Sequence, residues 1–136
     1  MMEHNADLKG IRVLVVEDDG DTRQMLAFIF KQSGAVVVAA GSFDEAVRVY
    51  QEIEPNVLVS DIGMPDFNGY ALITRIREED KKLGRLTPAI ALTAYTSDAD
   101  RQQALSSGFQ KYVGKPFEPA RLIEAVLDLV RPHFAD

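Results

Sequence analysis

The sequence contains no cysteine, which excludes disulfide bonds and thiolate metal sites. This absence is compatible with a reducing compartment such as the cytosol. Positive charge is also scarce, since 15 lysine and arginine residues stand against 21 aspartate and glutamate residues and give a net charge of −6. We expect no nucleic-acid binding, because a general nucleic-acid binder needs a basic face to neutralise phosphates.

Long hydrophobic runs are missing too, and no stretch approaches the length that spans a membrane. The first seven residues are polar and acidic, unlike a secretory signal. We therefore expect a cytoplasmic protein with no membrane partner. Its 136 residues, 46% of them hydrophobic, predict one globular domain with a substantial core. We expect this domain over residues 10–132, with loose tails over 1–9 and 133–136.

Short apolar runs alternate with amphipathic segments five times along the chain. The runs predict strands over residues 11–16, 35–40, 57–61, 88–93 and around 112–113. Helix-start patterns follow them, such as the capping boxes at Ser42–Glu45 and Ser97–Asp100. The third helix is expected to end in a solvated charged run over 77–82. Alternation of this kind predicts an α/β fold, a doubly wound five-stranded parallel sheet with helices on both faces.

Polar side chains follow the apolar runs at four of the predicted strand ends. Glu17 and Asp18 follow the first, Asp61 the third, Thr93 the fourth and Lys115 the fifth. Parallel strands end at one edge of their sheet, and ligands bind open α/β sheets at that edge. We therefore expect these side chains to lie close together.

These residue types suit phosphoryl transfer to a carboxylate. Clustered carboxylates repel one another unless a cation lies among them, and oxygen ligands with open water positions suit Mg²⁺. A carboxylate can attack phosphorus, while a metal and an ammonium group neutralise the phosphoryl oxygens. A threonine hydroxyl can donate to one of those oxygens. Singly, each residue also has a structural explanation as a helix cap, strand-end hydroxyl or surface charge, and only their joint position favours one site.

Four short motifs together resemble the receiver domain of two-component response regulators, over nearly all of residues 11–130. They are Val15-Val16-Glu17-Asp18-Asp19, Ser60-Asp61-Ile62-Gly63-Met64-Pro65 with Asn68-Gly69, Leu92-Thr93-Ala94, and Lys115-Pro116-Phe117. The resemblance implies a flavodoxin-like sheet with strand order 2-1-3-4-5. The segments around residues 91–95 and 108–110 resemble the receivers of hybrid histidine kinases more than those of transcription factors.

The resemblance also implies roles for individual residues. Asp61 would accept a phosphoryl group, with Lys115 beside it and a cis bond before Pro116. Mg²⁺, with Mn²⁺ as a substitute, would be held by Glu17, Asp18, Asp61 and the backbone carbonyl of Gly63. Thr93 and Tyr112 would form the switch that changes the surface of the fourth helix, fifth strand and fifth helix.

The implied protein catalyses its own phosphorylation and dephosphorylation and has no independent metabolic activity. Its phosphoryl donor would be a histidine kinase or a histidine phosphotransfer protein. Its switch surface would bind a downstream protein target, and the chain itself would be a monomer or weak dimer.

Several positions depart from the family pattern. Glu17 replaces the commoner aspartate, and Asn68 also replaces an aspartate. Gly63 and Tyr95 occupy the two positions that control water access in the family; a glycine opens the site, whereas a tyrosine closes it.

Three other functions are alternatives to the phosphoacceptor. The first is a pseudo-receiver that binds partners without phosphorylation, against which the intact Asp18, Asp61, Thr93 and Lys115 argue. The second is a haloacid-dehalogenase-type hydrolase, which needs an aspartate where this chain has Gly63. The third is a nucleotide-binding module, but the chain has no Gly-x-Gly-x-x-Gly and no P-loop.

Overall fold

Five strands and five helices alternate along the chain, as the sequence predicts. The computed structural model describes residues 7–63, 68–94 and 97–130. The elements are β1 (Arg12–Val16), α1 (Gly20–Gln32), β2 (Val36–Ala40), α2 (Phe43–Ile53), β3 (Val57–Asp61), α3 (Gly69–Leu83), β4 (Ala89–Thr93), α4 (Asp98–Ser107), β5 (Lys111–Gly114) and α5 (Pro119–Val130).

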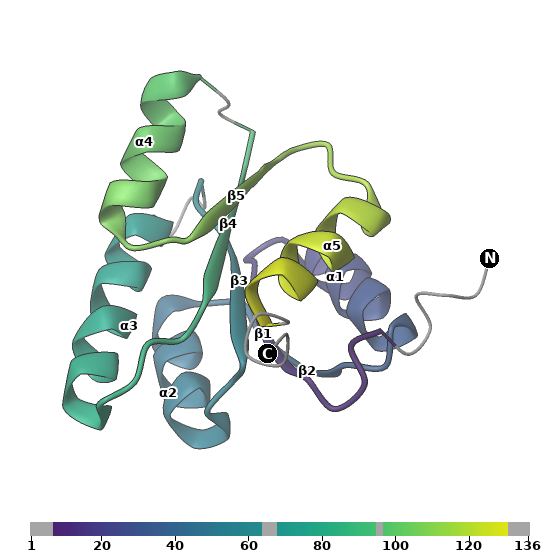
Figure 1. The fold of residues 1–136 in the computed structure, drawn as a ribbon, viewed down its shortest axis with the longest axis horizontal. Helices are drawn as coiled ribbons and strands as arrows, with labels where there is room; N and C mark the ends of the chain where they lie inside the picture. Colours follow the sequence, from purple (N-terminus) through teal and green to yellow (C-terminus); the bar gives the residue numbers. More distant parts are fainter. Residues whose placement is uncertain (1–6, 64–67, 95–96, 131–136) are drawn as a thin grey trace.

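The strands form one parallel sheet in the order β2-β1-β3-β4-β5, so the predicted fold class and strand order are confirmed. Helices α1 and α5 cover one face of the sheet, and α2, α3 and α4 cover the other (Figure 1). From β1 the chain adds β2 on one side of the sheet, and it then adds β3, β4 and β5 on the other side. The carboxyl ends of these two neighbouring strands therefore lie at the switch point of the sheet, where ligands bind.

Burial along the strands follows their position in the sheet. Every residue of β3 and β4 is buried, because both strands are central and both of their faces are covered by helices. Strand β2 lies at an edge, where Val36 is 54% exposed. The phosphoacceptor candidate Asp61 thus ends the most enclosed part of the sheet.

The predicted helix caps are present. Ser42 Oγ accepts from Glu45 N at 3.2 Å, and Ser97 Oγ accepts from Asp100 N at 3.1 Å. The Glu45 carboxylate accepts from Gly41 N rather than from the N-terminal cap residue itself. These contacts satisfy amide groups that the first turn of a helix leaves free.

The structure corrects two expectations about exposure. Leu8 is fully buried and its N–H donates to Ser33 O at 2.8 Å, so packing begins before the predicted tail boundary at residue 9. The run over 77–82 is not uniformly solvated, because Glu79 is 6% exposed and Asp80 only 2%. Asp80 continues the buried stripe of α3, seven residues after Ile73 and four after Ile76.

Asp80 is the centre of a polar group that we call the amino-edge cluster: Tyr50, Arg77, Asp80, Arg85 and Thr87. The Asp80 carboxylate accepts from the Tyr50 hydroxyl, from Arg77 Nη1 at 2.7 Å and from Thr87 N at 3.1 Å. Arg77 also donates to Gly108 O at 2.7 Å, which connects α3 to the start of the segment leading into β5. The cluster lies at the end of the sheet opposite Asp61, since Thr87 is two residues before β4 and Asp61 ends β3.

Candidate functional site

The ends of four strands meet at one edge of the sheet and bring the predicted residues together. Val16 pairs with Ser60, so the residues after β1 lie level with Asp61. Asp61 pairs with Leu92, and Thr93 pairs with Gly114, directly before Lys115. The register of a parallel sheet alone therefore places these side chains next to one another.

Three carboxylates form an acidic cluster at this edge. Glu17, Asp18 and Asp61 each present an oxygen atom, and these atoms all lie within 4.8 Å of one another. Glu17 is 2% exposed and Asp61 is 6% exposed. Ionised carboxylates this close and this buried are costly without a compensating cation.

Lys115 supplies one such cation. Its Nζ lies 3.2 Å from Asp61 Oδ2 and 3.6 Å from Glu17 Oε1. The Lys115 N–H donates to Thr93 O at 2.8 Å, which ties the end of β5 to the end of β4. The Lys115–Pro116 peptide bond is cis, as the resemblance implied.

One ammonium group leaves the acidic cluster with an excess of negative charge. Among the described residues, Glu17 Oε1 is buried without a hydrogen-bond partner, and it forms an ion pair with Lys115 at 3.6 Å. The pKa of Glu17 is raised to about 7, chiefly by burial and also by the charge of Asp61, against the lowering effects of the Asp19 N–H and of Lys115. Carboxylate oxygens are the ligands that Mg²⁺ prefers, and one oxygen of this cluster has no hydrogen-bond donor. The cluster therefore fits that ion.

The backbone around Asp61 fixes the direction of its carboxylate. Gly63 N donates to Asp61 Oδ1 at 3.2 Å, while Oδ2 faces Lys115. Gly69 begins α3 against this segment, where a Cβ would lie 2.7 Å from Asp61 O. Asn68 caps α3 by accepting from Ala71 N at 2.7 Å, so asparagine retains the capping function of the aspartate it replaces.

The two switch candidates lie on the face of the sheet that α2, α3 and α4 cover. Thr93 is 3% exposed, and Tyr112 pairs with Ala91, two residues before Thr93 on the same face of β4. Tyr112 is partly buried, and the Arg101 guanidinium of α4 lies 5.7 Å from the centre of its ring. Tyr95 lies outside the described residues.

Sequence reasoning missed one residue at this edge, Arg23 of α1. Its Nη1 donates to Glu17 O at 2.8 Å and to Asp18 O at 3.2 Å. No local pattern identifies it, because an arginine on the first turns of a helix is usually solvent-exposed.

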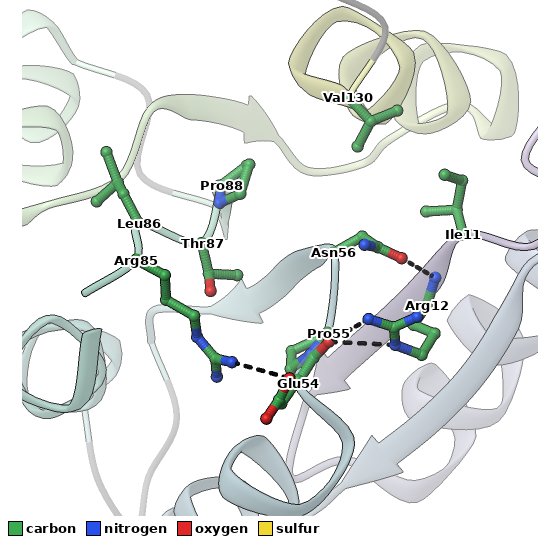
Figure 2. A pocket seen from close by; sticks show the side chains of 10 residues that line it. All are labelled: Ile11, Arg12, Glu54, Pro55, Asn56, Arg85, Leu86, Thr87, Pro88 and Val130. Atoms are coloured by element: carbon green, nitrogen blue, oxygen red, sulfur yellow. Dashed lines mark hydrogen bonds and ion pairs between the residues drawn. The ribbon is translucent and has the colours of Figure 1, made fainter. Parts of the chain in front are cut away.

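A second hollow lies away from this edge, at the amino ends of the strands (Figure 2). It measures about 410 Å³ and is lined by ten residues from Ile11 to Val130, and its charged groups already have partners. Arg12 donates to Glu54 O at 2.7 Å, and Arg85 lies 3.5 Å from the Glu54 carboxylate. Each of these charged side chains is thus paired within the pocket, although one nitrogen of Arg85, Nη2, is buried without a hydrogen bond.

Comparison with known proteins agrees with this geometry. The family model for the response regulator receiver domain matches residues 13–127. A 14.6 kDa protein from the sodA1 3′ region of Leptolyngbya boryana is 47% identical over 114 residues, which cover 84% of this chain and 86% of that protein. The receiver domain of the Francisella response regulator 1452 superposes with a TM-score of 0.82 at 30% identity, covering 91% of this chain and 99% of that one.

Other relatives are much longer than this chain. The transcriptional regulatory protein TrcR of Mycobacterium tuberculosis is 35% identical over 128 residues, 94% of this chain and 48% of TrcR. Probable histidine kinase 2 of Oryza sativa is 33% identical, with 91% of this chain matching 13% of the kinase. Within the described part of the chain, no helix is both long and apolar enough to cross a bilayer. The chain belongs to the response regulator receiver domains of two-component systems.

Proposed function

We propose that Asp61 accepts a phosphoryl group from a phosphohistidine, with Mg²⁺ held beside it. One observation carries this proposal: the buried Asp61 carboxylate lies 3.2 Å from the Lys115 ammonium and within 4.8 Å of carboxylate oxygens of Glu17 and Asp18. A nucleophilic carboxylate, a cation for the phosphoryl oxygens and a set of metal ligands are thus within reach of one bound phosphoryl group.

In the proposed reaction an oxygen of Asp61 attacks phosphorus and the P–N bond of the phosphohistidine breaks. The bonding electron pair leaves with the imidazole, and an acyl phosphate forms on Asp61. Lys115 neutralises charge on the phosphoryl oxygens, and the Thr93 hydroxyl donates to one of them. A bound Mg²⁺, held by Glu17, Asp18, Asp61 and the Gly63 carbonyl, supplies further charge neutralisation. Later attack by water on phosphorus breaks the bond to the Asp61 oxygen, releases inorganic phosphate and returns Asp61 to its carboxylate.

We propose that the switch follows from the new charge at Asp61. Thr93 moves toward the phosphoryl oxygens, and the Tyr112 ring turns inward behind it. Gly114 pairs with Thr93, and because it is a glycine, no β5 side chain lies beside Thr93 on this face of the sheet. Inward rotation takes the ring away from Arg101 and changes the α4–β5–α5 surface that binds a downstream protein.

The donor is proposed to be a histidine kinase or a histidine phosphotransfer protein, since receiver domains act within two-component systems. Thr93 is on an enclosed strand, but Asp18 and Lys115 remain partly exposed at the edge where a donor would approach. A cytosolic compartment supplies both Mg²⁺ and such a kinase.

The direct test is incubation with acetyl phosphate and Mg²⁺, followed by intact mass measurement. Wild type is expected to gain one phosphoryl group that is stable in acid and labile in base. Asp61→Asn should lose the adduct, whereas Asp44→Asn, a matched change of an exposed aspartate on α2, should keep it.

Three results would contradict the proposal. An unmodified wild type would favour a pseudo-receiver that binds its partners without phosphorylation. An undiminished adduct on Asp61→Asn would place the chemistry on another residue. Rapid turnover of many phosphate esters would favour a hydrolase instead.

A further inference from the structure

Arg23 connects α1 to the backbone that carries the acidic pair. Its Nη1 donates to Glu17 O at 2.8 Å and to Asp18 O at 3.2 Å. Neither bond involves a carboxylate, so Arg23 leaves the acidic oxygens of the cluster available to a metal ion. We call this pair of hydrogen bonds the Arg23 bridge.

The Arg23 bridge restrains the two peptide planes on either side of the Asp18 Cα. The Glu17 carbonyl belongs to the plane before that atom and the Asp18 carbonyl to the plane after it. Holding both planes restrains the backbone dihedrals of Asp18 and hence the direction of the Cα–Cβ bond from which its carboxylate projects. The second plane also carries the Asp19 N–H, which donates to Glu17 Oε2 at 3.1 Å, so the same restraint reaches the Glu17 side chain.

Gly41, which follows β2, makes room for the Arg23 guanidinium. A Cβ at Gly41 would lie 2.7 Å from Arg23 Nη1, closer than Cβ atoms come to their neighbours in proteins, and a tight 3.2 Å from Cζ. Gly41 does not have the positive φ that would itself require glycine. Its own position is fixed, because its N–H donates to Glu45 Oε1 at 2.8 Å. The glycine is therefore explained by the space that Arg23 occupies.

We propose that Arg23 is a positioning residue for the metal site, and that Gly41 is required for that role. The inference rests on the proposed function, because it assigns Mg²⁺ to the carboxylates of Glu17, Asp18 and Asp61. Arg23 itself contributes a positive charge near the cluster, which opposes a cation. When Arg23 is replaced, the loss of positioning should weaken Mg²⁺ binding, whereas the loss of its charge should strengthen Mg²⁺ binding.

The test is calorimetric titration of the full chain with MgCl₂, without any phosphoryl donor. Arg23→Gln is expected to bind Mg²⁺ about 10-fold more weakly, at the lower end of the loss seen when groups that orient metal ligands are removed. Arg23→Lys keeps the charge but not the forked geometry, and it should stay at least about 3-fold weaker than wild type. Arg48→Gln removes an exposed arginine from α2 and should change affinity by less than about 2-fold.

Gly41→Ala tests the positioning role independently, because the added Cβ displaces the Arg23 guanidinium and removes no charge. It should weaken Mg²⁺ binding in the wild-type background and have no further effect in Arg23→Gln, a coupling that defines a double-mutant cycle. Circular dichroism of each variant checks that the fold is retained.

The outcomes separate this inference from the proposed function. If wild type binds no Mg²⁺, the proposed metal site and the positioning role both fail. If wild type binds Mg²⁺ but Arg23→Gln binds it equally or more tightly, the positioning role alone is overturned. Full affinity in Arg23→Lys would overturn the need for the forked guanidinium, and an equal cost of Gly41→Ala in both backgrounds would show that Gly41 acts independently of Arg23.

Discussion

Two groups of buried charge lie at opposite edges of the same sheet, and they differ in balance. In the amino-edge cluster, Asp80 accepts from three neighbours, and Arg85 lies 4.9 Å from the centre of the Tyr50 ring and pairs with Glu54. In the acidic cluster of three carboxylates, Lys115 pairs with Asp61 and Glu17, and Glu17 Oε1 has no hydrogen-bond donor in the described part of the chain.

The difference teaches how to distinguish a structural polar group from a functional one. A polar group whose atoms nearly all have hydrogen-bond partners stabilises the fold and offers few contacts to a ligand. In the amino-edge cluster, Arg85 Nη2 is the one buried side-chain atom without a hydrogen bond. An excess of one charge at a sheet edge costs stability until a ligand neutralises it. Changes in the amino-edge cluster should therefore alter stability, and changes in the acidic cluster should alter chemistry.

The largest stability effect is expected from Asp80→Ala. Removing the carboxylate leaves Arg77, Tyr50 and the Thr87 N–H without their shared acceptor, and breaking a buried pair in this way costs about 3–5 kcal/mol. Urea denaturation measures the loss, and the folded fraction should still form the Asp61 adduct. A cost below about 1 kcal/mol would show that the amino-edge cluster is not structural.

A smaller, pH-dependent effect is expected from the acidic cluster. The pKa of Glu17 is raised from 4.5 to about 7, so the folded chain binds this proton more tightly than the unfolded chain. The resulting stability is present below about pH 4.5 and is lost as the pH rises through about 7, a loss of about 1–3 kcal/mol. Urea titrations in EDTA between pH 5 and 8 measure it.

Two matched measurements test this origin. Glu17→Gln should flatten the pH dependence and be more stable than wild type at pH 8, and saturating Mg²⁺ should remove most of the dependence in wild type. A wild type whose stability rises with pH across this range would contradict the assignment.

The smallest effect is expected from Tyr50→Phe. It removes one donor to Asp80 and leaves Arg77 and the Thr87 N–H in place, so the cost should be about 1 kcal/mol. Thermal or urea unfolding measures the change, with adduct formation as a control. A large loss of adduct without loss of stability would show that the amino-edge cluster contributes to the chemistry rather than to the stability of the fold.

Much of the fold could be predicted because local patterns determine it. Five apolar runs, each followed by a helix-start pattern, require crossover connections and hence a parallel sheet. The site followed from the same pattern, since Glu17, Asp61 and Thr93 each come directly after or end a buried strand.

Contacts between distant segments could not be predicted in the same way. Asp80 is buried by Tyr50 and Thr87, and its own neighbours in sequence are charged. Its spacing from Ile73 and Ile76 was the available signal, and a run of charges obscured it. Arg23 and Gly41 are 18 residues apart, and their contact beside the site forms only when α1 and β2 pack next to β1.

Mapping the phosphorylated residue tests the central claim most directly. After acetyl phosphate and Mg²⁺, borohydride reduction converts an aspartyl phosphate to homoserine, which peptide mass spectrometry can locate. We predict homoserine at position 61 alone, only in samples that received both reagents. Homoserine at position 18 or 19, or at no acidic residue of a folded and Mg²⁺-loaded chain, would contradict the assignment of Asp61.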